Sequence, residues 1–361
     1  MDLRSLDLDA VLAQAGQRAR EGLRLHAEAP GDEQGVADRA RKAGVAPALV
    51  LERARGASPW RDRGDLKKLR ALVAGTHPEL VHAWHTRDHV LGFRAAGGRA
   101  TLVRSVPRAE RIPRWPWNRW LFGRATDGLL LPSRAAALEN ASLCQGPVSG
   151  LLGAVDVARF APQAPAPEVR AGLGLESEHR VIGIVARVQR HRRFDLLLEA
   201  MARLSRRDPR ARLLIVGRGT HLEEVARRPA EALGIAERVV FAGYRGEDYA
   251  AVLRAIDVFT FLVPGSDGGC RALLEAQACG IPAVTTRRGA LPEIVADGET
   301  GSLVDEDADA LCEAWQELLD NPDRRAAWSQ AARSRAVRLF TRERLAAEVE
   351  ALYRAALRSP R

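Results

Sequence analysis

The segment Ser266–Pro282 (SDGGCRALLEAQACGIP) combines residue types that suit binding of an anion and of sugar hydroxyls. Its loop carries three residues without bulky side chains, Asp267, Gly268 and Gly269, and a run of helical period, Arg271–Ala278, follows at once. A helix that begins at such a loop offers main-chain N–H groups and its positive dipole end to a phosphate. Glu275, one turn inside the helix, could accept hydrogen bonds from ribose. A glycine turn before an amphipathic helix with a solvated glutamate explains this segment equally well.

A second group of polar side chains lies in Leu80–His89 (LVHAWHTRDH). The pattern places His82, His85, Asp88 and His89 near the carboxyl end of a strand. In doubly wound sheets this edge faces the ligand. The alternative is that these side chains cap the strand and the next helix.

The stretch Arg104–Arg124 interleaves Trp115, Trp117 and Trp120 with six arginines and a single acid, Glu110. Aromatic rings beside guanidinium groups suit a membrane interface or an anionic, lipid-linked acceptor. They also suit stacking on nucleic acid. The third interpretation is a short helix that packs its tryptophans into a core while the arginines face water.

The elements that must position these residues follow the pattern of parallel β-α-β units, in which short apolar runs alternate with longer stretches of helical period. The predicted strands are Leu23–His26, Leu80–Ala83, Thr101–Arg104, Gly128–Leu131, Val148–Leu152, Val181–Val185, Arg212–Val216, Val239–Ala242, Val258–Leu262 and Pro282–Thr285. A helix is expected between each two strands.

The stretch Phe160–Pro167 (FAPQAPAP) has no periodicity and little to bury, which predicts a linker between two doubly wound domains. We place an N-terminal domain at residues 1–160 and a C-terminal domain at 161–338. Residues 339–361 should close back toward the N-terminal domain, with one helix over Arg342–Leu357. A ligand site between the two sheets is expected.

Composition limits the class of protein. A chain of 361 residues with 46% hydrophobic residues can build two full cores. The net charge of +9 favours polyanionic ligands such as nucleotides, anionic lipid headgroups or nucleic acid. The four cysteines form no C-x-x-C pair, and no histidine cluster accompanies them at metal-ligand spacing. No apolar run approaches the length of a membrane span. We expect a soluble cytoplasmic protein, or one peripheral to the inner face of the plasma membrane.

Several motifs occur in an order that resembles the C-terminal domain of the retaining GT-B glycosyltransferases of family 4, over residues 178–335. They are Ala186-Arg187 with Arg192 five positions on, LLIVGRG (213–219), VVFAGY (239–244), AIDVF (255–259), the Ser266–Pro282 block and GALPEIVADGETGSLV (289–304). The resemblance implies two Rossmann-like domains that face each other across a cleft, with a nucleotide-diphosphate sugar, UDP- or GDP-linked, as donor and no cofactor.

The resemblance also assigns residues to the donor. Asp267, which stands where the family has glutamate, would contact the sugar ring, and Glu275 the ribose. Tyr244 or Arg245 lies where the family binds the base, although Tyr244 could equally pack in the core. Asp257 is more easily explained as structural. The full set of donor contacts is Gly217, Gly219, Tyr244, Arg245, Asp267, Gly268, Gly269, Cys270, Arg271 and Glu275.

The catalytic set that the resemblance implies is Arg187, Arg192, Glu275 and His85. Two guanidinium groups can bind a diphosphate and stabilise its charge as it leaves. The alternative is that they are solvated charges, as we expect for Arg190 and Arg193. We identify no D-x-D pair suited to a metal that bridges the diphosphate, so cationic side chains and the helix end would replace it.

On the acceptor side the resemblance points to His82, His85 and Asp88, while a second family histidine is missing near Ser105–Pro107. The family also opens with a strand and a glycine-rich loop, whereas this chain begins with a helical pattern. We expect a first strand to be missing, through a misassigned start rather than a functional short form.

The sequence thus predicts an enzyme that transfers a sugar to a glycan or lipid-linked hydroxyl acceptor with retention, in envelope polysaccharide, lipopolysaccharide or glycolipid synthesis. The alternative is a catalytically impaired module that binds nucleotide sugar. A basic nucleic-acid-binding protein rests on charge alone, and no G-x-G-x-x-G pattern supports a nicotinamide enzyme.

Overall fold

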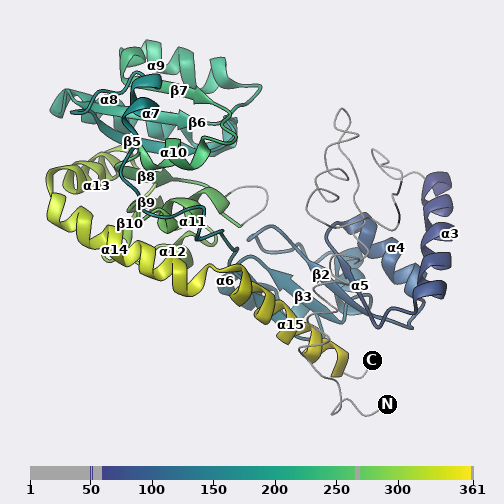
Figure 1. Ribbon diagram of the computed structural model, residues 1–361. Helices are drawn as coiled ribbons and strands as arrows, with labels where there is room; N and C mark the ends of the chain where they lie inside the picture. Colours follow the sequence, from purple (N-terminus) through teal and green to yellow (C-terminus); the bar gives the residue numbers. More distant parts are fainter. Residues whose placement is uncertain (1–48, 50, 52–58, 265–268, 359–361) are drawn as a thin grey trace. The chain divides into compact units, whose positions relative to one another are not determined.

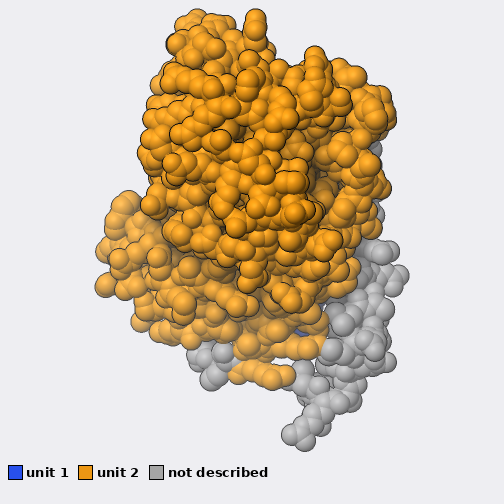
Figure 2. Space-filling model, turned by 90° about the vertical axis from the view of Figure 1, so that its left-hand side faces the viewer, with its two compact units in different colours: residues 1–102 blue, residues 103–361 orange. Residues whose placement is uncertain are grey.

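The structure is a computed structural model that describes residues 49, 51, 59–264 and 269–358. Contacts divide the chain into two compact units, residues 1–102 and 103–361, and the second supplies nearly all of the described surface in Figure 2. This division falls within a strand, and the predicted boundaries after residues 160 and 338 stay a prediction. The predicted strand Leu23–His26 lies outside the described residues.

The first part of the described chain alternates helices with short strands (Figure 1). The elements are α3 (Pro59–Thr76), β1 (Leu80–Ala83), α4 (Thr86–Ala96), β2 (Thr101–Ser105), α5 (Pro116–Gly123), β3 (Gly128–Leu131), α6 (Arg134–Asn140), the 3-10 turn η2 (Ala141–Leu143) and β4 (Val148–Gly150). The sheet has the order β1-β2-β3-β4, and the β2–β3 and β3–β4 pairs are parallel. The four strands predicted for the described residues of this part are therefore present.

A second, six-stranded sheet has the order β10-β9-β8-β5-β6-β7 and is parallel throughout. Its strands are β5 (Arg180–Val185), β6 (Ala211–Val216), β7 (Val239–Gly243), β8 (Val258–Phe261), β9 (Ala283–Thr286) and β10 (Gly301–Val304). Helix α7 (Pro167–Gly172) precedes these strands and α13 (Ala308–Asp320) follows them. The connections between the strands contain η3 (Arg190–Arg192), α8 (Phe194–Arg207), η4 (Glu223–Arg227), α9 (Arg228–Ala232), η5 (Ala236–Arg238), α10 (Tyr249–Arg254), α11 (Arg271–Ala278) and α12 (Leu291–Ile294). Five of these strands were predicted, whereas β10 was not.

Alternate side chains of these strands enter two different apolar cores. On β6, Leu214 and Val216 belong to one cluster of buried residues, and Leu213 and Ile215 belong to the other. Successive side chains of a strand point to opposite faces of the sheet, so the two clusters lie on its two sides. Helices cover both faces, which is why these strands are continuous apolar runs.

The Phe160–Pro167 stretch contributes more to the core than predicted. Residues 160–166 form no helix or strand, and Pro167 is the first residue of α7. Phe160, however, is only 5% exposed and its ring packs edge-on against that of Tyr249 at 5.8 Å. The expectation that this stretch buries little is therefore wrong at Phe160.

The chain ends in two long helices, α14 (Pro322–Leu339) and α15 (Arg342–Arg358), which are yellow in Figure 1. The helix predicted over Arg342–Leu357 is thus confirmed. A Cβ atom on Gly128, the first residue of β3, would lie 3.2 Å from side-chain atoms of Leu352 and Ala356. The last helix therefore packs closely against the start of β3.

Candidate functional site

The predicted donor residues gather where the strands of the second sheet end, at what we call its carboxyl edge. Arg187 follows β5, Gly217 follows β6, Tyr244 follows β7, and the loop before α11 follows β8. From β5 the chain adds β6 and β7 on one side and β8, β9 and β10 on the other, so the strand order reverses at β5. Ligands of such sheets bind outside the carboxyl ends of the strands at this reversal. The fold thus places these residues where a ligand is expected.

Gly217 and Gly219 have a structural role at this edge. Gly217 has a φ of +138°, and a Cβ atom on it would lie 2.1 Å from the carbonyl oxygen of Ala186. A Cβ atom on Gly219 would lie 2.0 Å from the carbonyl oxygen of Val188. Both glycines therefore allow the segment after β5 to run closely beside the segment after β6. Their contact with a nucleotide stays a prediction.

The arginine-rich segment after β5 separates into distinct environments. Arg192 is 9% exposed, and its Nη1 donates to the carbonyl oxygen of Val263, just beyond β8, at 2.9 Å. Arg187 is exposed at the strand end. Arg190 is exposed and pairs with Glu224 on η4. Arg192 is therefore held against the end of β8, beside the start of the segment that leads to α11.

Arg193 is more constrained than a solvated side chain. Its backbone is left-handed, with a φ of 58°, and its guanidinium pairs with Asp195 and with Glu306. Glu306 also pairs with Arg288, which follows β9. The solvated arginine predicted at this position is instead part of an ion-pair network.

Glu275 lies on α11 and is 9% exposed. Its Oε2 accepts a hydrogen bond of 2.7 Å from the hydroxyl of Tyr249, the first residue of α10. Burial raises the pKa of the Glu275 carboxyl, while the hydrogen bond from Tyr249 and the charges of Arg271 and Arg159 oppose that rise. The solvated glutamate of the alternative interpretation is excluded.

The amino end of α11 is only partly described. Asp267 and Gly268 lie outside the described residues. Gly269 is half-buried, and Cys270, which precedes the helix, has a left-handed backbone with a φ of 47° and is 1% exposed. Arg271, the first residue of the helix, is exposed. A contact between this helix end and a phosphate stays a prediction.

Tyr244 is not a core residue, because 71% of it is exposed. The guanidinium carbon of Arg218 lies 5.1 Å from the centre of its ring. Arg245 instead forms local bonds, to the carbonyl oxygen of Ala242 at 3.1 Å and to Asp248 at 2.9 Å. Tyr244 therefore presents an open aromatic face at the end of β7.

The predicted acceptor residues lie at the junction of β1 and α4. His85 is exposed and precedes the first residue of α4, but its side chain makes no capping hydrogen bond. His82 is half-buried and its ring stacks on that of Trp84 at 5.1 Å. Asp88 and His89 are buried in the first turn of the helix. Of the four predicted residues, only His85 and His82 keep exposed surface, and their acceptor role stays a prediction.

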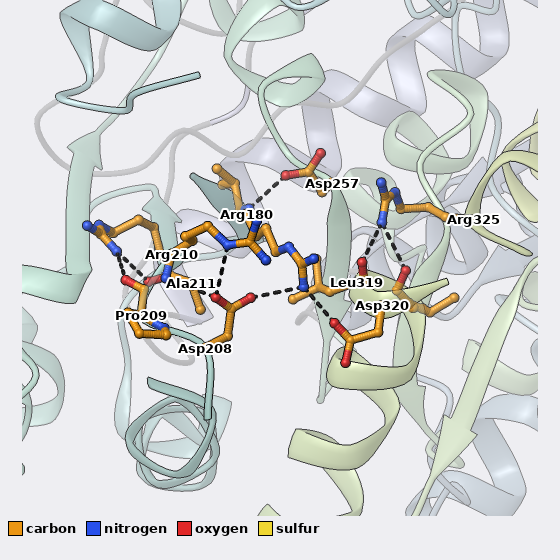
Figure 3. Close-up of polar contacts among 12 residues, drawn as sticks. Arg180, Asp208, Pro209, Arg210, Ala211, Asp257, Leu319, Asp320 and Arg325 are labelled. Atoms are coloured by element: carbon orange, nitrogen blue, oxygen red, sulfur yellow. Dashed lines mark hydrogen bonds and ion pairs between the residues drawn. The ribbon is translucent and has the colours of Figure 1, made fainter. Parts of the chain in front are cut away.

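The opposite edge of the second sheet carries a separate ion-pair network (Figure 3). Arg180, at the start of β5, pairs with Asp208 at 3.0 Å and with Asp320 at 2.7 Å. Asp257, just before β8, accepts a hydrogen bond of 2.7 Å from the main-chain N–H of Val181. Asp257 therefore joins two neighbouring strands, which agrees with the structural role expected for it.

Two residues at the carboxyl edge were not predicted from the sequence. Tyr249 is 26 positions from Glu275, and no spacing rule connects them. Glu293, in the GALPEIV motif, accepts hydrogen bonds from the main-chain N–H groups of Arg134 and Ala135 at 2.9 Å each. A carboxylate stabilises the amino end of a helix, here α6. The motif could have marked Glu293 as important but not its partner.

Within the described residues, no group of three or more histidine, cysteine or acidic side chains could hold a metal ion. No helix of the described part combines the length and the apolar character that crossing a bilayer requires. All four cysteines are buried, and no disulfide joins any two of them.

Comparison with known proteins places the chain in a family. Residues 166–335 match the family model described as glycosyl transferases group 1. The lipopolysaccharide core biosynthesis mannosyltransferase LpsB of Rhizobium meliloti is 30% identical over 251 residues, which cover 67% of this chain and 69% of that protein. The chain belongs to the group 1 glycosyltransferases. The predicted family is confirmed, while the assignment to family 4 and the retaining mode stay predictions.

Other relatives of this group 1 glycosyltransferase share less of their length with it. A GDP-mannose-dependent alpha-(1-6)-phosphatidylinositol monomannoside mannosyltransferase of Mycolicibacterium smegmatis is 39% identical over 73% of this chain and 65% of its own length. A D-inositol 3-phosphate glycosyltransferase of Segniliparus rotundus is 39% identical over 56% of this chain and 46% of its own length. The chain thus spans between about half and two thirds of these two relatives.

Solved structures confirm the fold. HepE of Anabaena with UDP aligns with a TM-score of 0.75 at 17% identity, covering 88% of each chain. A glycosyltransferase of Rickettsia africae aligns with a TM-score of 0.76 at 16% identity, covering 90% of this chain and 89% of that one. The group 1 glycosyltransferase has the predicted GT-B fold of two parallel-sheet α/β domains.

Proposed function

We propose that this protein transfers a mannosyl residue from GDP-mannose to a hydroxyl group of a lipid-linked or polysaccharide acceptor in cell-envelope synthesis. The observation that carries the proposal is the convergence of Arg192, Glu275 and the amino end of α11 at the carboxyl edge of one parallel sheet. The donor is chosen because the relatives from Mycolicibacterium smegmatis and Rhizobium meliloti are mannosyltransferases. The first of these relatives is named as a mannosyltransferase of a phosphatidylinositol monomannoside, which favours a lipid-linked acceptor.

In the proposed reaction the anomeric carbon keeps its configuration. The bond from this carbon to the β-phosphate oxygen breaks, and the acceptor oxygen bonds to the same face. The acceptor proton passes to the leaving phosphate, so the protein mainly positions the reactants and stabilises charge. Arg187, Arg192 and the N–H groups that begin α11 would bind the diphosphate without a metal, while Glu275 would bind the ribose. His85 would lie on the acceptor side.

Donor binding and transfer test this proposal. Titration with GDP-mannose and GDP should raise the melting temperature, because a ligand that binds only the folded form stabilises it. Transfer to a lipid-linked acceptor should release GDP, retain the anomeric configuration by NMR and survive EDTA. A higher melting temperature with UDP-sugars alone would change the donor. Binding without sugar release would favour the alternative of a catalytically impaired module.

We further propose peripheral contact with the inner face of the plasma membrane, through a surface on and before α5 that we call the Trp–Arg surface. Trp115 is 69% exposed, Trp117 is 52% exposed, and Trp117 stacks on Trp120 at 5.1 Å. The helix buries its other side through Leu121 and Phe122. The exposed arginines around the tryptophans are Arg108, Arg111, Arg114, Arg119 and Arg124.

Exposed indole rings favour the headgroup region of a bilayer, and arginines favour anionic lipids. The core-packing interpretation of this stretch is wrong for Trp115 and Trp117. Liposome flotation should show binding to vesicles with anionic lipid and loss of binding in a Trp115→Ala/Trp117→Ala variant. Trp84→Ala, which removes a tryptophan of similar exposure from another surface, is the control. Equal flotation of both variants would refute this surface, whatever the outcome of the donor assays.

A further inference from the structure

Tyr249 donates a hydrogen bond to one oxygen of the Glu275 carboxylate, the group that the proposed donor site uses to bind ribose. Its hydroxyl lies 2.7 Å from Oε2 of Glu275, in a half-buried environment. A phenol that donates to a carboxylate forms a charge-assisted hydrogen bond, which is stronger than a bond between neutral groups. The bond therefore constrains the rotation of the Glu275 side chain.

The Tyr249 ring is itself held by the segment that leads to α7. Phe160 packs edge-on against it at 5.8 Å, and the guanidinium of Arg159 lies 5.3 Å from the centre of the Phe160 ring. Arg254, at the end of α10, donates to the carbonyl oxygens of Arg159 and Ala161. Helix α10 and this segment thus form one packed unit around the tyrosine.

Charged and titratable groups face Glu275 from each neighbouring element. Tyr249 faces it from α10, Arg159 from the segment before α7, and Arg271 and Cys279 from both ends of α11. Burial and the Glu275 carboxylate raise the pKa of Tyr249, so its hydroxyl stays protonated and remains a donor. Since the hydrogen bond favours the charged carboxylate, removing it should favour the protonated form of Glu275.

We propose that Tyr249 is a positioning residue of the donor site, whose hydroxyl fixes the Glu275 carboxylate so that its other oxygen is presented to the ribose. This inference rests on the proposed function for the identity of the ligand. The hydrogen bond itself and its effect on Glu275 can be measured without any ligand.

The ligand-free test is the titration of Glu275 in the whole chain labelled with carboxyl-13C glutamate, where the signal missing from Glu275→Gln identifies the residue. Tyr249→Phe keeps the ring and removes the hydroxyl, and should move the titration midpoint of Glu275 to higher pH. Tyr353→Phe, a half-buried tyrosine of α15 that is not among the groups facing Glu275, should leave it unchanged. An unchanged midpoint in Tyr249→Phe, with the melting temperature of the wild type, would overturn the proposal.

The second test measures GDP binding by calorimetry across pH. Tyr249→Phe should weaken GDP binding about tenfold at neutral pH. As the pH is lowered, GDP binding by Tyr249→Phe should also be lost at a higher pH than binding by the wild type. The reason is that the ionised form of Glu275 accepts the ribose hydrogen bond, and this form is lost earlier in the variant. Glu275→Gln should abolish this pH dependence. If Tyr249→Phe is destabilised, Phe160→Leu, which loosens the ring contact and keeps the hydroxyl, should raise the midpoint less.

The outcomes separate the two proposals. If the wild type binds no GDP but Tyr249→Phe still moves the Glu275 midpoint, the proposed donor fails and the positioning role stands. If the wild type binds GDP with a pH dependence that Tyr249→Phe does not alter, the positioning role fails and the proposed donor stands.

Discussion

Replacing Arg192 with glutamine should show whether this arginine, unlike its neighbours in the same segment, binds the diphosphate of the donor as proposed. Arg192 is 9% exposed and reaches the end of β8, where Nη1 donates to Val263. Arg190, two positions earlier, is 68% exposed and pairs with Glu224. Arg190→Gln is therefore a matched control, since both changes remove one positive charge from the same 3-10 turn.

The magnitude follows from the bond that the guanidinium would make to the diphosphate. A hydrogen bond to a charged group contributes about 1.5–3 kcal/mol, which corresponds to roughly 10- to 100-fold in Kd. Arg192→Gln also removes the bond to Val263, which should cost about 1 kcal/mol of stability. Arg190→Gln should leave both quantities nearly unchanged, because exposed ion pairs contribute little.

Calorimetry with GDP and GDP-mannose, together with urea unfolding of the same samples, measures both effects. We expect a weaker Kd in Arg192→Gln while the variant remains fully folded under the assay conditions. Equal donor affinity in the two variants would refute the assignment of Arg192 to the diphosphate. A loss in Arg192→Gln that follows only from partial unfolding would appear as a reduced active fraction with an unchanged Kd.

Three further predictions concern the sheet that carries the site. Gly219→Ala should lower stability by about 1–3 kcal/mol in urea unfolding, since the new Cβ would overlap a carbonyl oxygen at 2.0 Å, and should also weaken GDP binding. Gly183→Ala places a Cβ atom 2.2 Å from Cδ1 of Ile256, so it should destabilise by a similar amount, and Ile256→Val in the same chain should recover part of that loss. Burial raises the pKa of Asp257, so the folded chain holds that proton more tightly than the unfolded chain. Its contribution to stability therefore falls as pH rises above the ordinary aspartate pKa of about 4, and Asp257→Asn should reduce this part of the pH dependence in urea unfolding.

The central strands of the second sheet were predictable because they are buried on both faces. Strands such as β5 and β8 are continuous apolar runs, which stand out in the sequence. The missed strand β10 contains Gly301 and Ser302, lies at the sheet edge, and is only alternately buried. An edge strand pairs on one side only, so neither its composition nor its length had to match the central strands.

The candidate site was predictable where motif order and strand ends coincide, as at Arg187, Gly217 and Tyr244. The structural role of each of these residues was harder to predict from the sequence. Gly217 has to be glycine because a Cβ atom there would clash with a main-chain carbonyl oxygen. Arg193 forms an ion pair with Glu306. Such facts depend on contacts between segments far apart in the chain, as does the bond from Tyr249 to Glu275. A single sequence shows spacing along the chain but not these partners.

Carboxylates at both ends of the strands form ion pairs with many of the arginines of this arginine-rich chain, which leaves fewer arginines to bind a ligand. At the amino edge, Asp208 and Asp320 pair with Arg180. At the carboxyl edge, Glu306 pairs with both Arg193, after β5, and Arg288, after β9. Replacing Glu306 would release Arg288 and leave Arg193 paired with Asp195 alone, which should strengthen binding of anions at the proposed donor site without improving transfer. Such acids would limit which positive charges a phosphate at the proposed donor site can meet.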